Sequence, residues 1–137
     1  MTRSIAAVFA GLVALTLLTF LIEAATTPWL MRSFPDALPS REAMQDNVAI
    51  KLFILLYSTL CMIVAAYLTA WIARRDGLRH AVIMAAIQVG LTAWAMSRFY
   101  DHAPLWAWLV GMALMVPAAW LGARLRANRQ ARPASPP

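Results

Sequence analysis

Residues 48–72, VAIKLFILLYSTLCMIVAAYLTAWI, decide the fold of this chain. The stretch is almost entirely apolar, and it is long enough to cross a bilayer as a helix, which takes roughly 20 residues at about 1.5 Å each. Its only charged residue, Lys51, lies close to one end. We therefore predict that this segment is a membrane-spanning helix.

Three further stretches have the same character, at residues 5–25, 80–98 and 104–123. With 62% apolar residues in a chain of 137, a soluble domain would have too few polar side chains to cover its surface. The sequence thus predicts an all-α membrane protein, a bundle of four transmembrane helices that occupies residues 1–127 as one domain. Residues 128–137 are polar and rich in proline, and they are predicted to form a disordered tail.

The connection between the first two spans, residues 26–47, is predicted to be the one sizeable loop, on the outer side of the membrane. It contains Pro28, and proline cannot continue a regular helix. Ser40, followed by an acid in the next turn, has the pattern of a helix N-cap. The second helix is therefore expected to begin near Ser40 and to run to about Ala73. Pro117 is expected to kink the last helix.

Basic residues are distributed unequally between the two ends of the predicted spans. If both termini share a compartment, eight arginines fall on their side, whereas three arginines, with Lys51 just inside the membrane, fall on the other. The richer side is expected to be cytoplasmic. Both termini are therefore predicted to be cytoplasmic, in a multi-pass protein of the bacterial inner membrane. The eight are Arg3, Arg74, Arg75, Arg79, Arg124, Arg126, Arg129 and Arg132.

The net charge of +6 does not indicate that the protein binds nucleic acid. Arginines at helix ends are explained by membrane orientation and by anionic lipid headgroups. The lipid bilayer is therefore the first partner that the composition predicts.

Glu23 and Lys51 are the ionisable residues inside the predicted spans, and both lie about one turn from the outer end of their helix. Thr19 shares the helical face of Glu23. Ionisable groups within membranes are costly and usually find a partner. We predict a Glu23–Lys51 ion pair, supported by Thr19 and Ser58, that clasps the first two helices. A lysine that reaches out to the interface and a role in moving a solute or proton are the alternatives.

Gln88 lies near the centre of the third span, with Thr92 one turn beyond it. A buried amide at this depth is expected to form a hydrogen bond to a neighbouring helix, worth roughly 1 kcal/mol. These side chains complete a candidate intramembrane polar cluster, which consists of Glu23, Lys51, Thr19, Ser58, Gln88 and Thr92.

The sequence has no arrangement of residues that indicates catalysis or metal binding. Cys61 is the only cysteine and is expected to be a packing residue. His80 and His102 fall at opposite membrane faces, so they cannot ligate one haem. No Ser–His–Asp set, phosphate-binding glycine loop or HExxH pattern is present. We therefore expect no enzyme activity, no cofactor and no metal.

Pairs of small residues recur at a spacing of four, which allows helices to approach closely. Such a pair occurs in every span: Ala7 and Gly11, Ala66 and Ala70, Ala86 and Gly90, and Ala118 and Gly122.

Three segments resemble those of the small, uncharacterised four-span inner-membrane proteins of bacteria. They are AYLTA at residues 66–70 before Arg74 and Arg75, PLW at residues 104–106, and GARLR at residues 122–126. The resemblance covers the whole chain and implies no catalytic residues. Small multidrug-resistance transporters also have four spans and an acid in the first, but their acid is central and their loops are short.

Two functions are consistent with these features. The first is a non-enzymatic structural or accessory subunit that binds other membrane proteins, or further copies of itself, through small-residue helix faces. The second is a small oligomeric transporter or channel for a proton, ion or small solute, with the polar cluster lining its path.

Overall fold

The computed structural model describes residues 2–36, 38–40, 44, 47–99 and 103–131. This part of the chain is helical and consists of α1 (Thr2–Ser33), α3 (Val48–Ala73), α4 (Gly77–Arg98) and α5 (Leu105–Ala131). Within the described residues, these four helices are each long and apolar enough to cross a membrane. The prediction of an all-α fold with four potential spans is confirmed.

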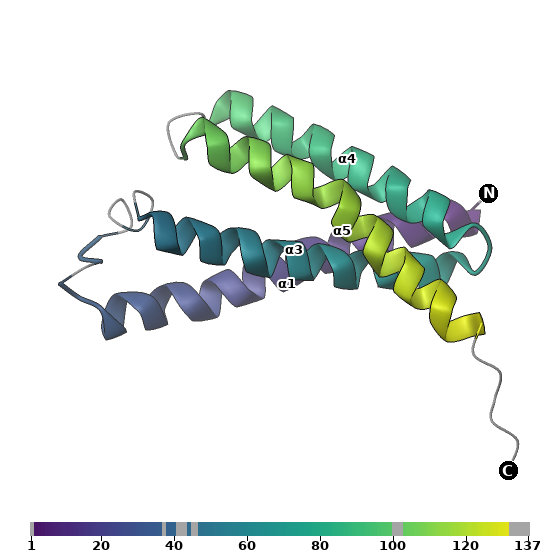
Figure 1. Ribbon diagram of the computed structural model, residues 1–137, viewed down its shortest axis with the longest axis horizontal. Coiled ribbons are helices and arrows are strands. Elements are labelled where there is room, and N and C mark those ends of the chain that lie inside the picture. Colours follow the sequence, from purple (N-terminus) through teal and green to yellow (C-terminus); the bar gives the residue numbers. More distant parts are fainter. Residues whose placement is uncertain (1, 37, 41–43, 45–46, 100–102, 132–137) are drawn as a thin grey trace, which may run out of the picture.

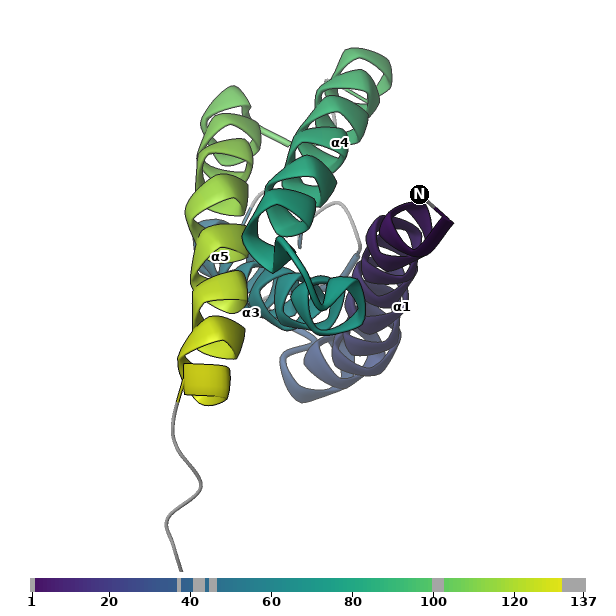
Figure 2. The ribbon, with the colours of Figure 1, turned by 90° about the vertical axis from the view of Figure 1, so that its right-hand side faces the viewer.

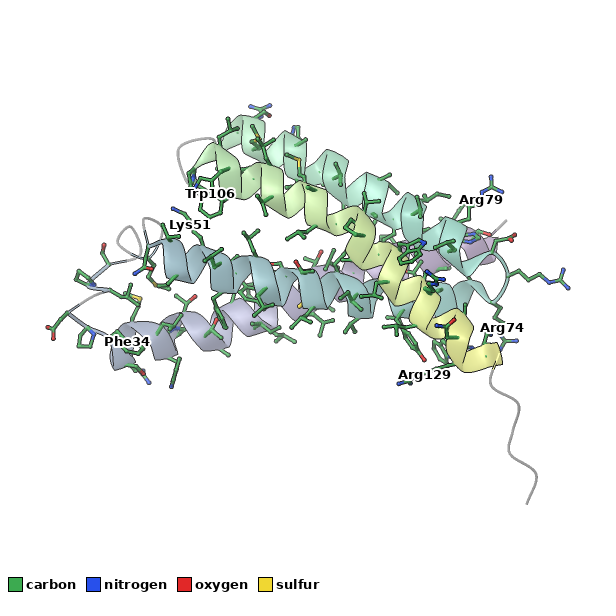
Figure 3. The ribbon with its side chains drawn as sticks, in the orientation of Figure 1. Phe34, Lys51, Arg74, Arg79, Trp106 and Arg129 are labelled. Carbon is green, nitrogen blue, oxygen red and sulfur yellow. The ribbon has the colours of Figure 1, made fainter. Side chains whose placement is uncertain are left out.

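The helices run alternately up and down, and the start of α1 and the end of α5 lie at the same end of the bundle (Figure 1). We name this end the Arg74 end, since Arg74, Arg79 and Arg129 all lie there (Figure 3). The opposite end, where α3 begins, is the Lys51 end.

Helix α3 is the centre of the molecule, because it packs against each of the other three helices. Figure 2 shows α1 and α5 on opposite sides of α3, with α4 lying across it. Helix α4 closes the arrangement through contacts with both α1 and α5.

The outer surface of the bundle is strongly apolar. In each helix, only 17–22% of the most apolar window is buried. Large side chains on every helix point outward, among them Ile5, which is 71% exposed, and Leu56, which is 60% exposed. Apolar side chains this exposed would be unfavourable in water but are compatible with contact to lipid.

Small residues close the Arg74 half of the bundle. Ala65, Ala119 and Thr69 are each 0% exposed, so the helix backbones approach closely there. The Thr69 hydroxyl donates to the Ala65 carbonyl, at 2.9 Å, so this buried hydroxyl is itself satisfied. At Gly122 of α5, a Cβ would collide with the backbone of α3.

The two helix pairs diverge toward the Lys51 end. Figure 1 shows α4 and α5 separating from α1 and α3 in that direction, and it shows a bend in the middle of α5. Pro117 lies within this stretch of α5, and proline bends helices because it removes a backbone hydrogen bond and its ring crowds the preceding turn. The predicted kink is present, and it separates the packed half of α5 from the divergent half.

Helix α1 continues past its predicted end at residue 25, through Pro28, to Ser33. A proline in a membrane helix is tolerated where other groups satisfy the backbone. The extra turns are also held by packing, since Leu30 and Met31 contact a small cluster of buried residues formed by Leu38, Met44 and Ile50. The predicted loop at residues 26–47 is therefore shorter than expected.

Helix α3 begins at Val48, so the prediction that it starts near Ser40 is wrong. Asn47 is extended and its side chain accepts hydrogen bonds from the amides of Ala49 and Ile50, at 2.9 and 3.3 Å. A side chain that satisfies free amides in this way fixes a helix start. Residues 41–43, which follow Ser40, lie outside the described residues.

Helix α5 includes residues 128–131, which the composition had assigned to a disordered tail. The Arg129 guanidinium lies over the Tyr67 ring of α3, at 5.6 Å from its centroid, and this contact favours continuation of the helix. The rest of the predicted tail, residues 132–137, lies outside the described part.

Candidate functional site

A cavity of about 430 Å³ occupies the Lys51 half of the bundle, between the diverging helix pairs. All four helices contribute side chains to it. On α1 and α4 the lining positions recur every four residues, at Thr19 and Glu23 and at Gln88 and Thr92, which is the spacing of one helix face. We call this space the polar cavity.

All six residues of the predicted polar cluster line the polar cavity. Helix α1 contributes Thr19 and Glu23, α3 contributes Lys51 and Ser58, and α4 contributes Gln88 and Thr92. The structure thus places around one space the polar side chains that the sequence had related only by their depth.

Lys51 is the most unusual of these residues, because it is charged and only 9% exposed. Figure 3 shows its side chain projecting from α3 toward the beginning of α5, near Trp106. Among the described residues it has neither an ion-pair nor a hydrogen-bond partner. A largely buried lysine is stabilised by a counter-charge, and none of the described residues supplies one, so an anion that enters the cavity would stabilise this position.

Glu23 does not supply that partner. It also lines the polar cavity, but no ion pair joins it to Lys51 in the described structure, and its side chain is exposed. Lys51 projects from the side of α3 that faces α5, whereas α1 packs on the opposite side (Figures 2 and 3). The predicted direct ion pair is therefore wrong, since depth alone does not bring two side chains together.

The predicted hydrogen bond from Gln88 to a neighbouring helix is also absent among the described residues. The Thr92 hydroxyl has only a long contact to the sulfur of Met115, at 3.9 Å. Helices α4 and α5 diverge from α1 and α3 here, so Gln88 lines the cavity and its amide makes no hydrogen bond with the other described lining residues.

The sequence analysis missed Trp108, Tyr57, Thr26 and Thr59, which also line the cavity. The indole nitrogen of Trp108 is buried and has no hydrogen-bond partner among the described residues. The hydroxyls of Thr26 and Thr59, by contrast, donate to carbonyls of their own helices, at 2.7 and 2.6 Å. Trp108 was missed because a tryptophan near a span end is also typical of an interfacial anchor.

Lys51 and Trp108 are therefore cavity-lining donors that lack an acceptor in the described structure. The rest of the lining is largely apolar, from side chains such as Leu15, Ile54 and Met62. An apolar space of this size with a few polar groups is typical of a small-molecule site.

The cavity ends near the middle of the bundle. Its innermost lining includes Leu15 and Met62, which are 7% and 2% exposed, and beyond them lie Thr69 and Met84, which are both fully buried. A path for solutes therefore does not continue to the Arg74 end in this structure.

The remaining candidates lie elsewhere. Cys61 is buried in the core and free, as a packing residue would be. His80 lies at the Arg74 end, where its Nδ1 is 2.9 Å from the Asp76 carbonyl oxygen, and His102 lies outside the described residues. In the part of the chain that is described, no three His, Cys, Asp or Glu side chains form a metal-binding group.

Comparison with protein-family models, with curated proteins and with solved structures finds no match for this chain. Its function must therefore be argued from the geometry of the cavity.

Proposed function

We propose that this chain is a membrane-embedded binding protein for a small amphiphile with an anionic head group. The single observation that carries the proposal is the largely buried Lys51 on the wall of the 430 Å³ polar cavity, which has no side-chain partner among the described residues. An anion bound there would form a charge-assisted hydrogen bond with Lys51 and offer an acceptor to the Trp108 indole. The apolar wall would receive the rest of the molecule.

The two charged residues of the cavity differ in their exposure to solvent. This difference favours an anion over a cation as the ligand. Glu23 is exposed, so water or lipid headgroups near the interface can solvate its carboxylate. Lys51 is buried, and solvent reaches it poorly. The larger gain in free energy therefore comes from a ligand that brings a negative charge to Lys51.

Binding is better supported than conduction. A channel needs a continuous polar path, but the cavity ends against Leu15 and Met62, and the small-residue core lies beyond them. A transporter would have to open this core in a second conformation. The proposal includes no catalytic step, because the side chains that line the polar cavity are suited to binding a ligand.

The test uses decanoate as the probe, with the protein in nanodiscs of zwitterionic lipid. Decanoate should raise the thermal stability of the wild-type protein, by about 2.7 kcal/mol at 100 times its Kd. Decylamine, which has the same chain but the opposite charge, should give a much smaller effect. Lys51→Met should abolish the stabilisation by decanoate.

Arg32→Met is the matched control. Arg32 is an exposed cation in the last turn of α1, and it does not line the cavity. This variant should respond to decanoate as the wild type does. Loss of the response in both variants, or no response in the wild type, would overturn the proposal.

We further propose that the protein resides in the bacterial inner membrane with both termini in the cytoplasm. Its support is the excess of arginines on the side of the termini and the general bias of cytoplasmic loops toward basic residues. In this orientation the polar cavity lies in the outer half of the membrane.

An accessory subunit that binds other membrane proteins is the second candidate. Most of the small-residue pairs are used inside the bundle, since Ala7 and Ala66 are fully buried and Ala118 is only 4% exposed. On α4, however, a Cβ at Gly90 would have nothing within 4 Å, and Ala86 is exposed on the same face. If this face binds a partner, Gly90→Leu should remove a protein that co-purifies with the wild type in mild detergent. An unchanged set of co-purifying proteins would exclude this face.

A further inference from the structure

A second cavity, of about 370 Å³, lies at the Arg74 end between the end of α3, the start of α4 and the last turns of α5. Three arginines line it, Arg74, Arg124 and Arg126. We call it the arginine cavity. It shares no lining residue with the polar cavity.

Within the described part of the chain, no acidic side chain lines the arginine cavity beside the three guanidinium groups. The Nε of Arg126 is buried and finds no hydrogen-bond partner in the part of the chain that the structure describes. Like charges gathered around a partly buried space repel one another, so this arrangement favours a bound anion.

The start of α4 adds to the positive potential. Gly77 and Leu78, its first two residues, line the arginine cavity. The preceding residue, Asp76, has a left-handed backbone with φ of 53°, and its side chain makes no capping hydrogen bond. The first amides of α4 therefore lack a cap from the Asp76 side chain, and they lie beside the cavity with the positive end of the helix dipole, where phosphate binds in other proteins.

Apolar side chains lie beside these cationic groups. Leu78 and Trp120 both line the arginine cavity, and they are 47% and 42% exposed on the outer surface of the bundle. The Arg124 guanidinium stacks on the Trp120 ring, at 4.5 Å from its centroid, so the charged and apolar groups are held together.

We propose that the arginine cavity binds the phosphate group of an anionic phospholipid, with an acyl chain along Leu78 and Trp120. Arginine suits this role because its planar guanidinium forms paired hydrogen bonds with phosphate oxygens. Basic pockets between membrane helices recognise lipid headgroups in this way. The proposal is independent of any ligand in the polar cavity.

The test measures thermal unfolding in a neutral detergent, with added phosphatidylglycerol, phosphatidylcholine or inorganic phosphate. Phosphatidylglycerol should raise the Tm of the wild type by several degrees, and the other two should have little effect. Arg126→Gln and Arg124→Gln should each remove most of this shift. The second variant keeps the test decisive if the first does not fold.

Arg79→Gln is the matched control, since Arg79 lies at the same end and is exposed but does not line the cavity. It should retain the full shift. An equal loss of the Tm shift in Arg79→Gln would show that phosphatidylglycerol is attracted by net charge alone. That result would overturn the arginine cavity as a specific site. An equal shift with inorganic phosphate would overturn the lipid as its source, and no shift with phosphatidylglycerol would overturn the proposal.

Discussion

At the scale of single residues, Lys51 shows how a potential function can oppose stability. A lysine in the second turn of a membrane helix would usually extend toward the headgroups. Here it is 9% exposed, faces a cavity and lacks a partner among the described residues. Such a residue raises the free energy of the folded state, and residues of this kind are concentrated at binding sites.

Lys51→Met should therefore stabilise the ligand-free protein, by about 1–2 kcal/mol, because it replaces an unpaired buried charge with an apolar side chain of similar length. Glu23→Gln should change stability by less than about 0.5 kcal/mol, since Glu23 is exposed. Without a direct ion pair, the double variant should show the sum of the two effects to within about 0.5 kcal/mol. Unfolding of the purified protein in detergent measures all three changes.

If Lys51→Met destabilised the protein and Glu23→Gln then restored part of the loss, the two charges would interact directly. This outcome would contradict the arrangement in which both line one cavity without contact.

At the scale of the helices, glycines differ according to which half of the bundle contains them. A Cβ at Gly122 would meet the Ile63 carbonyl and lie 2.9 Å from the Ala66 Cβ, both on α3. A Cβ at Gly90 would meet nothing within 4 Å. The spacing of small residues predicts where helices can approach closely, but it does not show which faces are used, because that depends on how each helix is rotated.

Gly122→Ala should destabilise the protein by about 1–3 kcal/mol, since the backbone of α3 cannot move aside as a flexible side chain would. Gly90→Ala, the matched substitution in an open position, should be neutral or stabilising by up to about 1 kcal/mol through helix propensity. Thermal unfolding in detergent compares the two. Equal effects would mean that α3 and α5 are not in close contact at Gly122.

Helix boundaries depended on local hydrogen bonds that composition does not reveal. Asn47 fixes the start of α3 by accepting from two backbone amides, although Ser40 offered an equally good capping pattern in the sequence. Pro28 did not end α1, since Leu30 and Met31 beyond it pack into a small cluster of buried residues. At the start of α3 one local capping signal prevailed over another, whereas at Pro28 tertiary packing outweighed a valid local signal.

At the scale of the whole molecule, the bundle is closed at the Arg74 end and open at the Lys51 end. Small buried residues such as Ala65 and Ala119 bring the helices together at the first end. At the other, α4 and α5 diverge, beyond a bend in the stretch of α5 that contains Pro117 (Figure 1). This asymmetry creates the polar cavity and closes its inner end.

Reporter fusions test the orientation proposed for the bundle. Fusions after Arg79 and after Arg126 should both report the cytoplasm, and a fusion after Pro39 should report the outer side, because arginines are concentrated at the ends expected to be inside. A reporter after Arg126 that is active outside would overturn this orientation and place the polar cavity in the inner half of the membrane.

The sequence by itself determined that this is an all-α chain with four segments able to span a bilayer, and that Glu23 and Lys51 lie at a similar depth. Length and hydropathy are properties of each segment, so they can be determined for one segment without knowing how the others pack. Only the tertiary structure decided that Glu23 and Lys51 share a cavity without pairing, that Trp108 faces the same space, and that Arg126 faces another. The physical reason is that these relations depend on the rotation of each helix and the divergence between helix pairs, which many side-chain contacts determine together.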